Sequence, residues 1–164
     1  MKNIIRPFSL TFFLIINLIL ADTYFVSKNG LESNDGSKKH PWHSINYALS
    51  VVGGGNTIIV LSGVYTEQIH LSRDQSGTQE NPTIIKANQK WGASISAANK
   101  IGIVVDYNCN WIIIDGFKIT GSPSAGVLLR SDNIKIMNCW ISHNSSGIYI
   151  HNRINCKIEN NLIE

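Results

Sequence analysis

The chain has 164 residues, of which 43% are hydrophobic and 15% are charged. This length limits the protein to one domain, and the low charged fraction predicts few helices. The formal net charge is +3, and without Lys2 and Arg6 near the N-terminus 12 basic residues face 11 acidic ones, a net charge of +1. Such a balance excludes the basic surface of a nucleic-acid-binding protein.

Residues 1–21 have the pattern of a secretory signal peptide. Lys2 and Arg6 give a positive start, a mostly apolar run extends from Phe8 to Leu20, and Ala21 offers a small residue for cleavage. The run is short for a membrane span, which needs about 20 apolar residues. A retained signal anchor is the alternative. We therefore expect a secreted, extracellular protein that has no contact with the membrane after signal cleavage.

Residues 22–56 are predicted to form an N-terminal strand and a capping helix. The strand covers residues 24–27 and is closed by a turn at Asn29 and Gly30. Ser44 is suited to cap a helix, and the apolar residues that follow it recur at helical spacing until Gly53. This helix would cover the open apolar end of the repeats that come after it.

A pair of histidines, His40 and His43, has the spacing His-x-x-His with a proline inside. No third ligand accompanies the pair, so a loop leading into the helix is preferred over a metal site. We predict no metal site from these residues.

Residues 57–164 consist of short β-branched runs separated by Gly, Asn and Ser turns. One pattern recurs with a step of 22 residues, so that Ile114, Ile136 and Ile158 are equivalent. A fixed period of this length marks a solenoid, and helical repeats of that kind need about 33 to 47 residues. The sequence therefore predicts an all-β fold, a parallel β-helix of stacked coils.

The period also predicts which side chains face inward, because like residues stack on like in successive coils. The expected columns are Ile112/Ile134/Cys156, Ile114/Ile136/Ile158, Ile119/Ile141/Ile163 and Val105/Leu129/Ile150.

Sharp corners are expected where Asn138 and Asn160 share a position with Gly116, since these residue types tolerate a left-handed backbone.

Three cysteines are an awkward number for an exported chain. By the period, Cys156 falls on the Ile134 column and Cys139 on the Phe117 position, so both are interpreted as small apolar core residues. Cys109 lies in a turn and could be free. No cysteine spacing matches a zinc site.

Several motifs occur in a fixed order near the N-terminus: Tyr24-Phe25-Val26-Ser27, Asn29-Gly30, Asn34-Asp35-Gly36-Ser37, Pro41-Trp42, Gly63-Val64-Tyr65, Ser76-Gly77-Thr78 and Asn81-Pro82-Thr83-Ile84. This order resembles the N-terminal segment of secreted right-handed parallel β-helix proteins of the family 9 pectate lyase-like group. The resemblance covers nearly all of the chain that follows the signal and implies the right-handed form of the fold.

The resemblance also implies an activity and a cofactor. Lyases of this kind carry out calcium-assisted β-elimination on an acidic polysaccharide, with calcium held by several aspartates and a basic residue that removes a proton. In the family these residues lie in later coils, and this sequence has no such acidic cluster, so no catalytic residue is carried over. A non-enzymatic surface or adhesion module is the alternative, because the fold alone does not choose between the two.

One set of polar residues is a candidate substrate-binding site. Asp106, Arg130 and His151 each lie four residues after the glycine of a second repeated pattern, so they should form a column about 10 Å long on the outer wall. Arg130 can bind a carboxylate through two hydrogen bonds, and His151 can be charged in mildly acidic surroundings. These properties suit a uronate chain, but a solvated column with a weak Asp106–Arg130 ion pair is the alternative.

The last residue, Glu164, falls within a repeat, and no capping segment follows it. Natural solenoids cover both ends, so we expect the chain to be the N-terminal part of a longer, monomeric β-helix.

Overall fold

The computed structural model describes residues 21–97 and 99–164. The predicted signal peptide, except for Ala21, lies outside the described residues. Within them, no helix is both long enough and apolar enough to cross a membrane.

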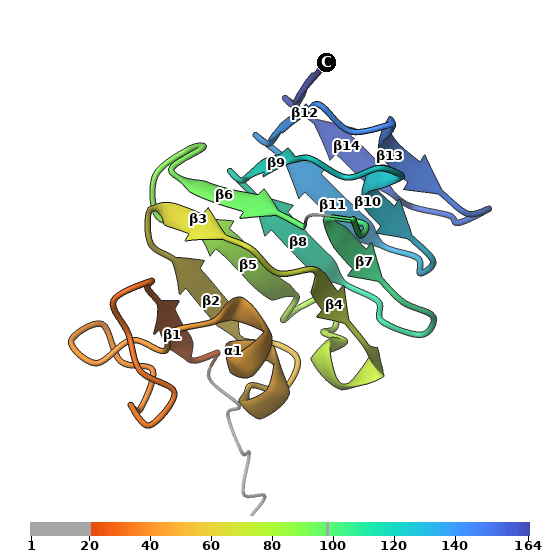
Figure 1. Ribbon diagram of the computed structural model, residues 1–164. Coiled ribbons are helices and arrows are strands. Elements are labelled where there is room, and N and C mark those ends of the chain that lie inside the picture. Colours follow the sequence, from red (N-terminus) through yellow and green to blue (C-terminus); the bar gives the residue numbers. More distant parts are fainter. Residues whose placement is uncertain (1–20, 98) are drawn as a thin grey trace, which may run out of the picture.

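The chain winds through three parallel sheets in turn, and each circuit forms one coil (Figure 1). Sheet A contains β1 (Thr23–Val26), β2 (Thr57–Val60), β5 (Thr83–Ala87), β8 (Ile112–Asp115), β11 (Ile134–Met137) and β14 (Lys157–Glu159). Sheet B contains β3 (Gly63–Tyr65), β6 (Ala93–Ser96), β9 (Lys118–Thr120), β12 (Trp140–Ser142) and β15 (Leu162–Ile163). Sheet C contains β4 (Ile69–Leu71), β7 (Ile103–Val105), β10 (Ala125–Leu129) and β13 (Ser146–Ile150). This arrangement confirms the predicted right-handed parallel β-helix.

The N-terminal strand is part of the solenoid. Strand β1 pairs in parallel with β2, so that Tyr24 lies beside Ile58 and Val26 beside Val60. The segment before the first full coil therefore extends sheet A by one strand.

The predicted capping helix is α1 (Ile45–Val51), and the hydroxyl of Ser44 accepts a hydrogen bond from the backbone N–H of Tyr47 at 3.0 Å. Its buried residues, which include Ile45 and Leu49, belong to the same core cluster as the strands. The helix lies over the end of the first coils (Figure 1).

A short 3₁₀ helix, η1 (Arg73–Gln75), follows β4 and fastens α1 to the solenoid. The side-chain amide of Gln75 is buried and donates a hydrogen bond to the backbone oxygen of Leu49 at 2.8 Å. The polar excursion after β4 is therefore anchored to the capping helix.

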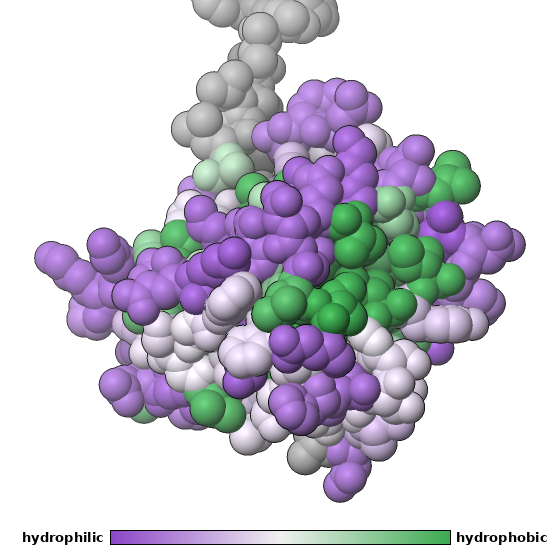
Figure 2. Space-filling model, turned by 90° about the horizontal axis from the view of Figure 1, so that it is seen from above, coloured by the Kyte–Doolittle hydropathy of each residue, from purple (hydrophilic) through white to green (hydrophobic). Residues whose placement is uncertain are grey.

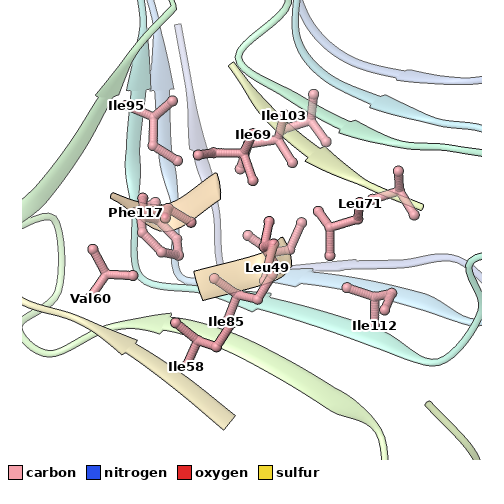
Figure 3. Packing of buried hydrophobic residues seen from close by; sticks show 14 of the residues in the cluster. Leu49, Ile58, Val60, Ile69, Leu71, Ile85, Ile95, Ile103, Ile112 and Phe117 are labelled. Carbon is pink, nitrogen blue, oxygen red and sulfur yellow. The ribbon is translucent and has the colours of Figure 1, made fainter. Parts of the chain in front are cut away.

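The core is a stack of aliphatic side chains that point inward from all three sheets (Figure 3). The predicted columns are confirmed by the strand register, in which Ile114 lies beside Ile136 and Ile136 beside Ile158. Ile114 and Ile136 are 1% and 0% exposed, whereas Ile158 in the last coil is 38% exposed.

The corners between sheets A and B adopt the expected left-handed conformation. Gly116 has a φ of 78°, and both Asn138 and Asn160 have a φ of 55°. Asparagine is tolerated there because its short polar side chain bonds locally and reduces the cost of this backbone conformation.

The three cysteines are free, and Cys109 and Cys139 are completely buried. Burial raises the pKa of each of these two thiols to about 12. Cys139 is thus a core residue, as predicted. The turn that holds Cys109 is also folded into the core, because the backbone N–H of Cys109 donates to the hydroxyl of Ser131 at 2.9 Å.

Apolar side chains are exposed at the end of the last coil, and Figure 2, seen from that end, shows hydrophobic surface gathered there. The exposed residues of this region include Ile150, Ile154, Ile158, Leu162 and Ile163. In the coils before them, the equivalent positions are covered by the next coil.

Candidate functional site

The predicted site residues Asp106, Arg130 and His151 follow the ends of β7, β10 and β13 in sheet C. The backbone N–H of Arg130 donates to Val105, and that of His151 donates to Leu129, both at 2.9 Å. Parallel pairing therefore places the three residues at equivalent positions in successive coils.

Asp106 forms an ion pair with Arg130 and also contacts a residue of the preceding coil. Its Oδ1 lies 3.5 Å from a terminal nitrogen of Arg130, and its Oδ2 lies 3.2 Å from Nε2 of His70. The backbone N–H of Tyr107 donates to Oδ1 at 2.9 Å. This N–H, together with His70 and Arg130, holds the pKa of the Asp106 carboxyl below its ordinary value.

Tyr107 lies near two guanidinium groups. The Cζ atom of Arg130 is 5.6 Å from the centre of the Tyr107 ring, and that of Arg153 is 5.9 Å from it. Guanidinium groups are attracted to aromatic faces, so the ring holds both cations close together. We call His70, Asp106, Tyr107, Arg130 and Arg153 the Asp106 cluster. It contains two permanent positive charges and one carboxylate.

His151 does not join the Asp106 cluster but lines a groove next to it. Its ring centre is 6.3 Å from that of Tyr149. The groove has a volume of about 400 Å³, and its walls include Ile101, Ser124, Leu128, Arg130, Tyr149 and His151. We call it the sheet C groove. Arg130 belongs to both the groove and the cluster, so an anion in the groove would contact a guanidinium group that is already positioned.

Sequence reasoning missed His70, Tyr107 and Arg153. Strand alternation could have identified His70, because it lies between the inward-facing Ile69 and Leu71. Tyr107 and Arg153 lie in turns, outside the strands of sheet C. A strand period carries no information about the path of a turn.

The residues of these coils do not suit calcium. Among the described residues, no group of three or more His, Cys, Asp or Glu side chains could hold a metal ion. Calcium takes six to eight oxygen ligands, whereas both oxygens of Asp106 face nitrogen atoms of neighbouring groups. We therefore derive no step that requires calcium. In the His-x-x-His pair noted in the sequence, Nε2 of His43 lies 3.2 Å from the ammonium nitrogen of Lys28.

Asn144 is the acceptor position of a glycosylation sequon, but its amide is used within the fold. Its Nδ2 donates to the backbone oxygens of Ile119 and Ser142 at 3.0 Å, and its Oδ1 accepts from the backbone N–H of Ser122 at 2.9 Å. A glycan on this nitrogen would disrupt the corner between sheets B and C.

Comparison with known proteins identifies relatives of the chain. The family model described as "Pel9A-like, right handed beta helix region" matches residues 24–164. A pectate lyase, PEL9 of Emericella nidulans, is 26% identical over 106 residues, which are 65% of this chain and 21% of the relative. The chain spans between 21% and 27% of the length of the curated relatives it matches.

Two solved structures share the fold. The GH136 lacto-N-biosidase from Eubacterium ramulus aligns with a TM-score of 0.67 at 16% identity, over 85% of this chain and 34% of the enzyme. A rhamnogalacturonan lyase aligns with a TM-score of 0.64 at 20% identity, over 86% of this chain and 42% of that protein. At these identities the likeness is one of fold.

Proposed function

Because the chain belongs to the Pel9A-like right-handed β-helix family, we propose that it binds an acidic polysaccharide along the outer wall of sheet C. Its relatives include a pectate lyase, and a rhamnogalacturonan lyase shares its fold. The two names are those of lyases that act on pectate and on rhamnogalacturonan. The ligand class proposed for this chain is therefore a polymer of uronate sugars.

The Asp106 cluster is the observation that carries this proposal. Arg130 and Arg153 are both held at Tyr107, and Arg130 also lines the sheet C groove. A guanidinium group binds a carboxylate through two parallel hydrogen bonds. Since Arg130 is already placed by Tyr107 and Asp106, less side-chain entropy is lost when the ligand binds.

The sheet C groove offers an apolar surface for the sugar rings. Tyr149 is 55% exposed and stands beside Leu128 in the pairing of β10 with β13. An exposed aromatic ring and a few polar side chains around an apolar floor are usual in ligand grooves. The proposal concerns binding, and we assign no catalytic step to the residues of these coils.

We also propose that the protein acts outside the cell as a monomer. The basic start and the apolar run of residues 1–21 support export. A polysaccharide ligand fits this location.

Calorimetry with a short oligogalacturonate tests the function. The wild-type protein should bind it, and Arg130→Ala should reduce the affinity at least about tenfold, since a charge-assisted hydrogen bond contributes about 1.5–3 kcal/mol. Lys39→Ala is the matched control, because it removes one exposed positive charge from the loop before α1. The proposal is wrong if the wild type does not bind or if Arg130→Ala binds equally well.

A further inference from the structure

A second groove lies on another wall of the solenoid, outside sheet A. Its volume is about 430 Å³, and it runs across the beginnings of β8, β11 and β14. Gln79, Pro82, Trp111, Ile113, Lys135 and Lys157 contribute to its lining. We call it the sheet A groove. None of its residues belongs to the Asp106 cluster or the sheet C groove.

Trp111 is an unusual residue for its backbone position. Its φ is 59°, in the left-handed region, and the equivalent residues of the next two coils are Asn133 and Asn155, with φ values of 59° and 55°. A bulky residue is a genuine outlier in this conformation, whereas asparagine is tolerated. The corner itself therefore favours asparagine, and strain of this kind is concentrated at functional sites.

Among the residues that the structure describes, the indole N–H of Trp111 has no hydrogen-bond partner and can therefore donate to a ligand. The other three indole N–H groups, those of Trp42, Trp91 and Trp140, donate to oxygen atoms of the chain at 2.7, 2.8 and 3.2 Å. In the part of the chain that the structure describes, Trp111 makes no such bond. A partly exposed indole with a free N–H offers both an apolar face and a hydrogen-bond donor.

Two lysines give the sheet A groove a positive charge. Lys135 and Lys157 are direct neighbours in the pairing of β11 with β14, and their like charges repel each other. Glu159 forms an ion pair with Lys135 at 2.7 Å, and the charge of Lys157 acts on it only from a longer distance. Among the described residues, no carboxylate lies within ion-pair distance of Lys157. A bound anion would relieve the repulsion.

Two amide side chains add further polar groups. Nδ2 of Asn155 donates to Oδ1 of Asn133 at 3.1 Å. This bond leaves hydrogens of the Asn133 amide as donors and the oxygen of Asn155 as an acceptor. Sugar hydroxyls need both kinds of partner, so these amides suit a saccharide better than a simple anion.

We propose that the sheet A groove is a second saccharide-binding site, which takes an acidic oligosaccharide with one sugar ring on Trp111 and a carboxylate on Lys157. The polarised C–H bonds of a sugar ring are attracted to the negative face of the indole. The ligand class rests on the proposed function. A single-stranded nucleic acid fits less well, because it requires successive aromatic platforms along a basic track, and this groove has one aromatic residue.

The substitution Trp111→Asn tests the site because it inserts the residue that the next two coils use at this corner. The fold should be as stable as wild type or more stable, while the affinity of the groove for oligogalacturonate should fall at least about tenfold. Loss of thermal stability in Trp111→Asn would assign Trp111 to packing and overturn the proposal.

Nuclear magnetic resonance separates this site from the sheet C groove. The protein has four tryptophans, and the indole N–H signal that disappears in Trp111→Asn belongs to Trp111. On titration with oligogalacturonate, this signal should move in the wild type and also in Arg130→Ala. Lys157→Ala should lower the affinity measured from this signal about tenfold. Lys86→Ala, on the same sheet but outside the groove, should leave that affinity unchanged.

Three other results would each contradict one part of the proposal. A Trp111 signal that stays in place while calorimetry detects binding at Arg130 overturns the second site and leaves the proposed function intact. If a neutral cello-oligosaccharide moves the Trp111 signal with the same affinity as oligogalacturonate, the ligand need not be acidic, and the proposed ligand class is wrong. Tighter binding of oligothymidylate than of oligogalacturonate would show that the groove binds a nucleic acid and not a saccharide.

Discussion

At the scale of single residues, Glu67 joins the capping helix to the first coil. Its two carboxylate oxygens accept the backbone N–H groups of Ile45 and Asn46, each at 3.0 Å, and the hydroxyl of Ser44 accepts that of Tyr47. The first N–H groups of a helix have no partner within the helix, and a carboxylate at that end also interacts favourably with the helix dipole. One side chain of the coil thus replaces a capping box within the helix itself.

Glu67→Ala should lower the free energy of unfolding by about 1.5–3 kcal/mol, because two N–H groups lose a charged acceptor. Glu67→Gln should cost less, since an amide oxygen can still accept one of the two bonds. Urea denaturation measures both values, and Glu80→Ala in the exposed loop before β5 is the control. Equal stabilities of Glu67→Ala and Glu80→Ala would show that Glu67 does not hold the helix.

At the scale of the elements, each strand contributes alternate side chains to the core and to a wall. Ile136 in β11 is completely buried between Ile114 and Ile158, whereas the neighbouring Lys135 points outward and pairs with Glu159. Adjacent residues of one strand therefore have opposite environments.

Ile136→Asp should destabilise the protein by about 3–5 kcal/mol, because it buries an unpaired charge among isoleucines. Lys135→Ala removes only a partly exposed ion pair and should cost less than about 1 kcal/mol. Thermal or urea unfolding of the two variants compares them directly. Similar costs at both positions would contradict the register of β11.

The sequence was sufficient to predict the columns, the corners at Asn138 and Asn160, and the capping helix. These features follow from strand and helix periods, which are local properties of the chain. The site was only partly predictable. The alignment of Asp106 with Arg130 follows from their equal distance from the glycine of the second repeated pattern, but His70 comes from an earlier coil with a different spacing. Arg153 reaches Tyr107 from a turn, and only the three-dimensional path of the chain brings them together.

At the scale of the whole molecule, the buried thiols link global stability to alkaline pH. Burial raises the pKa of Cys139 to about 12 in the folded protein, whereas an unfolded cysteine has a pKa of about 8.5. Below about pH 8.5 the thiol is protonated in both states and does not affect the free energy of unfolding. Above it, the unfolded chain loses the proton first, so the folded state becomes less stable as the pH rises towards 12.

The free energy of unfolding of the wild type should therefore fall more steeply between pH 9 and pH 11 than that of Cys139→Ala. The difference in slope should approach about 1.4 kcal/mol per pH unit. Urea denaturation at a series of pH values gives both slopes, and other alkaline groups, such as Tyr65, contribute equally to the two proteins. Parallel curves over this range would mean that Cys139 does not titrate with unfolding.

The three walls of the solenoid share one packed core, so the outer faces of sheets A and C keep a fixed separation and direction. A short oligosaccharide bound at one of the two proposed sites cannot reach the other, because the sites lie on different walls. Its effective concentration at the second site is therefore close to zero. Short oligosaccharides would then bind with a stoichiometry of two, without avidity. Two long polymer chains bound to different walls would be cross-linked by a single protein molecule.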